Sequence, residues 1–210
     1  MPKTKSILIP SLIAPPAFIY ALFALHDEII IDCFETYPKQ TLRNRYNIGG
    51  PNKTQILTIP VKKPNGHSTK TKDIEIDYTT NWIDIHCRSM ITAYSKSPFF
   101  IYYSDYIFNQ FNKRHKLLID LNMSIHELLM KWLNIAATTK YSENFVTNFD
   151  GLNLRDECKK NNDWSVKNDY YQPFQAEFGF RNSLSVFDII FNLGPETNDF
   201  IINESKYANI

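Results

Sequence analysis

The first thirty-two residues alternate between apolar runs and short breaks. Residues 5–9 are an apolar run that predicts a short buried strand. Pro15-Pro16 favours a helix start before residues 17–25, because the N–H groups that proline lacks would have no partner in a first helical turn. Residues 28–32 predict the next strand. Such a strand–helix–strand unit favours two parallel strands joined by a right-handed crossover.

The pattern changes after residue 40, and residues 41–78 predict sheet. Leu57, Ile59 and Val61 occupy alternate positions, and Ile74 and Ile76 alternate with charged residues. This period of two is typical of strands with one buried face. The segment between them is rich in lysine and threonine and predicts an exposed basic turn. That turn is either simply solvated, the more common case, or in contact with phosphate.

Helical spacing dominates residues 80–136, and a last apolar helix is predicted to stop at Gly194-Pro195. Residues 140–180 show the least regular pattern, so we expect loops there. Together these elements predict a single α/β domain over residues 1–210. Its mixed sheet would combine the N-terminal strand–helix–strand unit with residues 41–78, and the helical block 80–136 would pack on that sheet.

Composition removes several function classes. The 210 residues include six glycines, whose positions allow neither a GxGxxG turn nor a GxxxxGK[ST] phosphate loop. The formal net charge of +1 gives no support for a nucleic-acid partner, because phosphate neutralisation supplies most of that affinity. The three cysteines lie far apart, so we expect a reducing, cytoplasmic location. Prolines interrupt the apolar N-terminal stretch, and we expect no integral membrane protein.

Arginine is scarce, with six residues among 23 basic ones, so its positions are informative. If residues 40–46 form a strand, Arg43 and Arg45 project from one face. Two guanidinium forks side by side can hold a phosphate or a carboxylate through parallel N–H groups. The plainer alternative is a pair of arginines in ordinary ion pairs.

Two further groups could carry chemistry. His86 lies five residues after Asn81 on the first helix predicted after the sheet, and an imidazole suits general acid–base catalysis. A lone helical histidine more often has a structural role. Asp188 and Asn192, four residues apart, and the following Glu196 form either the polar side of the last helix or one wall of a cleft. We find no metal-binding motif and expect no cofactor.

Several distinctive strings occur in a characteristic order. They are PKQTLRNR at 38–45, LTIPV at 57–61, Asn81-Trp82 with His86, AYSKSPFF at 93–100 and SVFDIIFNLGPE at 185–196. On these strings, over residues 5–131 and 170–196, the chain resembles the WbqC-like family of bacterial proteins. The resemblance implies a role in cell-surface polysaccharide biosynthesis, such as that of O-antigen, with transferase-like activity on activated sugars. It also implies polar site positions at Gln40, Arg43, Asn44, Arg45, Asn81, His86, Tyr94, Asp188, Asn192 and Glu196.

The chain departs from the family pattern at two places. The first turn, residues 9–16, lacks the usual polar and aromatic groups, which puts a ligand role for that turn in doubt. Cys87 stands where a tryptophan is usual after the histidine. Catalysis by Cys87 is disfavoured, because adjacent helical residues point about 100° apart and a Cys–His pair would be poorly aimed.

Two functions are compatible with these observations. In the first, the chain is an enzyme that holds an activated sugar or another anionic small molecule with Arg43 and Arg45, and His86 acts as general acid or base. In the second, it is a non-catalytic accessory protein that docks on partner enzymes of polysaccharide assembly. The arginines would then be ion-paired to buried carboxylates.

Overall fold

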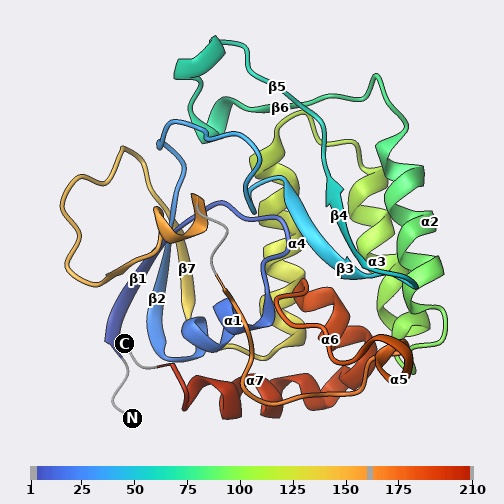
Figure 1. Ribbon diagram of the computed structural model, residues 1–210. Coiled ribbons are helices and arrows are strands. Elements are labelled where there is room, and N and C mark those ends of the chain that lie inside the picture. The colour runs from blue at the N-terminus through green and yellow to red at the C-terminus, as the bar shows by residue number, and fades with distance from the viewer. Residues whose placement is uncertain (1–3, 160–162, 209–210) are drawn as a thin grey trace.

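A parallel four-stranded sheet forms one side of the molecule (Figure 1). The structure is a computed structural model that describes residues 4–159 and 163–208. Strand β1 (Thr4–Pro10) pairs on one side with β2 (His26–Asp32) and on the other with β8 (Leu152–Asn153). Strand β7 (Thr138–Tyr141) pairs with the outer side of β2. The order is therefore β7-β2-β1-β8, with every pair parallel.

The strand–helix–strand unit forms as predicted. Helix α1 (Ala17–Ala24) begins directly after Pro16 and connects β1 to β2. Ile7 and Ile9 on β1 and Ile29 on β2 are completely or almost completely buried. Such near-continuous apolar runs are typical of parallel strands that are covered on both faces. The α/β class is confirmed.

Helices make up the other side of the molecule and its base (Figure 1). The block predicted for residues 80–136 is confirmed as α2 (Trp82–Tyr94), α3 (Phe100–Asn112) and α4 (Leu118–Trp132). Three more helices follow, namely α5 (Gln175–Phe178), α6 (Val186–Leu193) and α7 (Thr197–Ser205). Helix α7 runs beneath α1 and contacts it, which brings the end of the chain against its beginning.

Residues 41–78 differ from the expectation. They form two separate antiparallel ribbons, one of β3 (Arg45–Gly49) with β4 (Thr54–Thr58) and one of β5 (Val61–Lys62) with β6 (Glu75–Ile76). The sheet is instead completed by β7 and β8. Strand β8 and the end of β7 lie in residues 140–180, which were expected to be loops. These two strands are short and polar, so they lack the apolar alternation that identifies a strand in sequence.

Helix α4 fixes the segment that carries four of the ten candidate residues. The Asn122 side-chain amide donates to the Ser11 hydroxyl at 3.0 Å and to the backbone oxygen of Arg43 at 2.9 Å. The loop after β1 and the loop before β3 are thereby tied to one helix. Cys33, Cys87 and Cys158 are free thiols. Within residues 4–159 and 163–208, no helix has the length and apolar character needed to cross a membrane.

Candidate functional site

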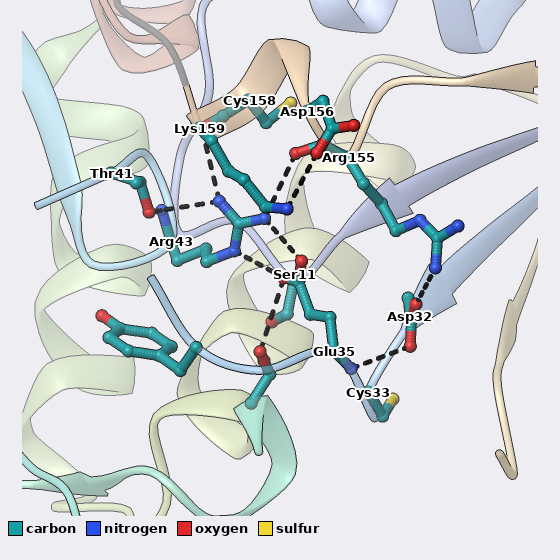
Figure 2. Close-up of polar contacts among 12 residues, drawn as sticks. Ser11, Asp32, Cys33, Glu35, Thr41, Arg43, Arg155, Asp156, Cys158 and Lys159 are labelled. Atoms are coloured by element: carbon teal, nitrogen blue, oxygen red, sulfur yellow. Dashed lines mark hydrogen bonds and ion pairs between the residues drawn. The ribbon is translucent and has the colours of Figure 1, made fainter. Parts of the chain in front are cut away.

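Arg43 lies inside the protein, in the loop before β3, and is paired with a buried carboxylate (Figure 2). Its Nε donates to Glu35 Oε1 at 2.5 Å and its Nη2 to Glu35 Oε2 at 2.8 Å. Nη1 donates to the Thr41 hydroxyl at 3.2 Å and to the backbone oxygen of Cys158 at 3.3 Å. A bidentate pair of this kind fixes both groups in position and occupies the arginine fork.

The predicted face with two adjacent arginines does not form. Arg43 precedes the strand, whereas Arg45 is its first residue and pairs with Thr58 in the register of the β3–β4 ribbon. The face does not form because the Arg43 guanidinium turns into the interior, where it is hydrogen-bonded to the Glu35 carboxylate. Arg43 therefore has the role given in the second of the two predicted functions, in which the arginine is ion-paired to a buried carboxylate. Arg45 is half-buried, and its Nε has no hydrogen-bond partner within the described part of the chain.

A second ion pair lies at the end of β2 (Figure 2). Asp32 is completely buried, and its Oδ2 accepts from Arg155 Nη1 at 2.5 Å. Its Oδ1 accepts from the backbone N–H groups of Phe34 at 2.9 Å and Glu35 at 3.2 Å. Asp32, Glu35 and Arg155 were not predicted. The sequence did offer one signal for this site, because Asp32 is the last residue of a predicted buried strand. Side chains at the carboxyl ends of parallel strands gather at one edge of the sheet.

The segment after β2 also lines a cavity of about 400 Å³, here called the lysine cavity. Its polar lining residues are Tyr37, Lys39, Gln40, Asn44, Lys63 and His67. Lys63 Nζ donates to the backbone oxygen of Tyr37 at 2.9 Å and lies 4.9 Å from the centroid of the Tyr37 ring. Partial burial, followed by the positive charge of Lys39, lowers the pKa of Lys63. The described lining residues include no carboxylate, so the two lysines give the cavity an uncompensated positive charge.

Two residues that line this cavity carry buried polar atoms without partners in the part of the chain that the structure describes. The Tyr37 hydroxyl and Asn44 Oδ1 find no hydrogen-bond partner among the described residues, although Asn44 Nδ2 donates to the Ile59 backbone oxygen at 2.8 Å. Leaving such a group unpaired costs about 1–3 kcal/mol. Burial raises the pKa of the Tyr37 hydroxyl, so it stays a neutral donor. Gln40 has a left-handed backbone conformation with φ 60°, a strained geometry that concentrates at functional positions.

His86 lies away from both groups, within a cluster of aromatic rings. It is 2% exposed, and the rings of Tyr46, Trp82 and Phe111 meet it edge to face. Its Nδ1 is 2.9 Å from the Tyr46 hydroxyl and its Nε2 is 3.2 Å from the Thr58 backbone oxygen. Burial lowers the pKa of His86 to about 4, which keeps the ring neutral. These surroundings describe a structural histidine of the core.

Three other predicted residues meet at a separate polar cluster on α6. Asp188 is 1% exposed, and its Oδ2 accepts from the Tyr170 hydroxyl at 2.7 Å and from Gln172 Nε2 at 3.2 Å. The Tyr94 hydroxyl also bonds to Asp188 and accepts from the Gly49 N–H at 2.9 Å. Asn192 Nδ2 donates to the Asp188 backbone oxygen at 2.8 Å. Tyr170 and Gln172 were missed, since they lie in the stretch without a regular pattern.

Burial raises the pKa of Asp188 to about 6, against the hydrogen bonds that lower it. The folded state therefore binds a proton more tightly than the unfolded state, and this group's contribution to stability falls as pH rises from about 4 to about 6. We expect Asp188→Asn to remove that fall. In urea unfolding from pH 4 to pH 7.5, the stability of the variant relative to wild type should rise by about 3 kcal/mol. His86 and His126 titrate in both proteins, so their contributions cancel in the difference between the two free energies of unfolding. A difference that stays constant from pH 4 to pH 7.5 would contradict the prediction.

The last two predicted residues are on the surface. Asn81 precedes α2, and its Nδ2 lies 3.5 Å from Asp84 Oδ2. Glu196 is exposed before α7. The structure thus brings Gln40 and Asn44 to the lysine cavity and Tyr94, Asp188 and Asn192 to the α6 cluster, and it leaves Asn81, His86 and Glu196 apart from both. Among the described residues, no group of His, Cys, Asp and Glu side chains could hold a metal ion.

The fold and cavity define an α/β protein with a positively charged cavity beyond the carboxyl end of β2. The chain belongs to the WbqC-like protein family, whose sequence profile matches residues 13–162. The matched region contains the lysine cavity and both buried ion pairs and ends before helix α6. A relative, "Uncharacterized protein Rv1507c" of Mycobacterium tuberculosis (strain ATCC 25618 / H37Rv), is 25% identical over 87% of this chain and 90% of its own length. No solved structure matches the chain.

Proposed function

We propose that the chain is a transferase-like enzyme of cell-surface polysaccharide biosynthesis that holds the anionic part of an activated sugar in the lysine cavity. The observation that carries the proposal is that Lys39 and Lys63 both line a 400 Å³ cavity whose described lining has no carboxylate. Burial and Lys39 already lower the pKa of Lys63. A bound anion would relieve that repulsion and form charge-assisted hydrogen bonds with both ammonium groups.

The wall of the cavity supports a ligand that carries hydroxyl groups as well as charge. The Tyr37 hydroxyl can donate and Asn44 Oδ1 can accept, and both are unpaired among the described residues. The ionised diphosphate of an activated sugar has no proton to offer Asn44, whereas the sugar hydroxyl groups do. The chain cannot build a glycine-rich phosphate cradle, so side chains would have to supply these contacts.

The proposal changes the roles of the residues implied by family resemblance. Arg43 supports the site from within, because its fork is occupied by Glu35. His67 lines the lysine cavity, and we place it in the acid–base role that the sequence suggested for His86. His86 has both ring nitrogens engaged in the core and has no part in the proposed chemistry.

We expect Lys39→Ala and Lys63→Ala each to weaken the binding of UDP-glucose about tenfold or more, since a hydrogen bond to a charged group contributes about 1.5–3 kcal/mol. Isothermal titration calorimetry at low and high salt measures the effect. Lys53→Ala is the matched control, because Lys53 is exposed in the turn between β3 and β4. Inorganic phosphate serves as a second probe. Equal dissociation constants in all three variants and the wild type would remove the lysine cavity from the proposal.

A specific observation favours the alternative of an accessory protein. Helices α2 and α3 lie on the side of the molecule away from the sheet (Figure 1), and they carry exposed large apolar side chains, namely Ile85, Ile91, Ile101, Tyr102 and Tyr106. Exposed apolar side chains that gather into one patch are typical of a protein–protein contact. The two functions differ in a cell that depends on this chain for surface polysaccharide. Loss of polysaccharide with Ile101→Glu but not with Lys63→Ala would favour the accessory function, and the reverse would favour the enzyme.

A further inference from the structure

A second hollow of about 400 Å³ lies on the other side of the segment that lines the lysine cavity. We call it the Arg155 hollow after the arginine at the right of Figure 2. It is lined by Glu35 and Thr36 after β2, by Asn153 at the end of β8, by Arg155, Asp156 and Phe145, and by Lys70 and Lys159. Glu35 also holds Arg43, so one buried ion pair stands between the two hollows.

The topology of the sheet marks this place. From β1 the chain moves to β2 and then to β7 on one side, whereas β8 pairs with the opposite side of β1. The direction in which strands are added therefore reverses between β1 and β8. In open parallel sheets, ligands bind outside the carboxyl ends of the strands at such a reversal. The Arg155 hollow is formed at those ends by residues that follow β2 and end β8.

The electrostatics of the hollow differ from those of the lysine cavity. Every carboxylate at the hollow has a cationic partner: Glu35 has Arg43, Asp156 has Lys159 at 2.8 Å, and the buried Asp32 behind it has Arg155. Lys70 Nζ donates to the Thr36 hydroxyl at 3.1 Å. Among the described residues Lys70 has no carboxylate partner, so the hollow offers many donors and acceptors and a weaker positive field than the lysine cavity, where two lysines lack such a partner. Such a lining suits a ligand with several hydroxyl groups.

An aromatic ring supplies the remaining element. Phe145 is 51% exposed, and the Arg155 guanidinium lies 4.9 Å from the centroid of its ring. Arg155 is held by Asp32 through Nη1 and by Asn153 Oδ1 through Nε at 3.2 Å. The hollow thus presents an apolar ring beside hydrogen-bonding groups that are already fixed. A pyranose ring has the complementary surfaces, with an apolar C–H face and a polar edge of hydroxyl groups.

We infer that the Arg155 hollow is a second binding site, for a neutral polyhydroxylated ligand of the hexopyranose class. Its lining residues are separate from those of the lysine cavity, so the inference stands without the proposed anion site. Among the described residues of each lining, a nucleotide or phosphate would find fewer lysines without a carboxylate partner here than in the lysine cavity.

The test is an amide ¹H–¹⁵N NMR titration of the full chain with D-glucose, D-galactose, D-mannose and N-acetyl-D-glucosamine in turn. We expect at least one sugar to produce saturable shifts at the amides of residues 145 and 153–156. Phe145→Ala should weaken that binding about three- to tenfold, as expected for losing one aromatic contact. Phe178→Ala is the matched control, since Phe178 is also exposed and has Arg181 at 5.0 Å from its ring centroid.

Three outcomes would overturn the inference. The first is the absence of saturable shifts at these amides with all four sugars. The second is an equal affinity in Phe145→Ala and wild type, with the variant shown to be folded by its unchanged spectrum elsewhere. The third is a response of the same amides to inorganic phosphate at lower concentration than to any of the sugars. Lys63→Ala separates the two sites, because it should weaken anion binding and leave sugar binding unchanged.

Discussion

Replacing Glu35 by alanine is expected to lower the free energy of unfolding by about 3–5 kcal/mol. The change leaves the Arg43 guanidinium buried without its carboxylate, and removing one partner of a buried pair costs about this much. For a domain of this size the melting temperature should fall by about 10 °C. Urea unfolding and differential scanning calorimetry at neutral pH measure the two quantities.

Two comparisons make the Glu35 prediction specific. Asp84→Ala breaks the exposed i,i+4 pair with Arg88 on α2 and should cost no more than about 0.5 kcal/mol. The double change Glu35→Leu with Arg43→Met removes both charges and should recover much of the stability lost in Glu35→Ala. If Glu35→Ala proved as mild as Asp84→Ala, Arg43 would have to be accessible to solvent, which would return it to the list of ligand-binding residues.

Gly194→Ala is expected to destabilise the protein by about 3 kcal/mol or more. Gly194 follows α6 with φ 54° and ψ −123°, a conformation that side chains other than glycine rarely adopt. A Cβ there would also overlap the ring of Phe99. The backbone N–H of Phe99 donates to the Phe191 backbone oxygen at 3.0 Å, so the ring cannot easily withdraw. Strain and overpacking therefore add.

Gly66→Ala separates the two contributions. Gly66 has a similar φ of 57°, but a Cβ there would meet nothing within 4 Å. We expect a cost of about 1 kcal/mol from backbone strain alone. Chemical denaturation of both variants under one set of conditions gives the comparison. Equal losses in the two would show that the contact with Phe99 contributes nothing.

Much of the fold could be predicted from apolar periodicity. Pro15-Pro16 and the run at 17–25 located α1, and the runs at 5–9 and 28–32 located the two central strands, because buried parallel strands are apolar throughout. Strands β7 and β8 were not predicted, because they are short and have no apolar run. Thr138–Tyr141 and Leu152–Asn153 pair through backbone atoms with strands more than a hundred residues earlier, and their side chains carry no trace of that pairing.

The candidate site was harder to predict. The sequence shows which residue types are present, but it does not show which side chains each of them contacts in the folded protein. The sequence located Gln40, Arg43 and Asn44, but it could not show that Arg43 turns inward to Glu35, eight residues earlier. His86 was singled out for the chemistry of imidazole, whereas burial among Tyr46, Trp82 and Phe111 decides its protonation. Lys63 belonged to a turn judged to be solvated, and only the approach of Tyr37 makes that turn part of a cavity wall.

The sheet order has a consequence for synthesis and folding. Strand β1 obtains its second neighbour from residues 152–153, and α1 is contacted by a helix that ends at Ser205. A chain emerging from the ribosome therefore keeps β1 and α1 incompletely covered until residues 152–205 have been translated. Contacts between such distant segments slow folding, because loop-closure entropy must be overcome before they form. The apolar surfaces of β1 and α1 thus remain exposed in the nascent chain while more than a hundred further residues are added.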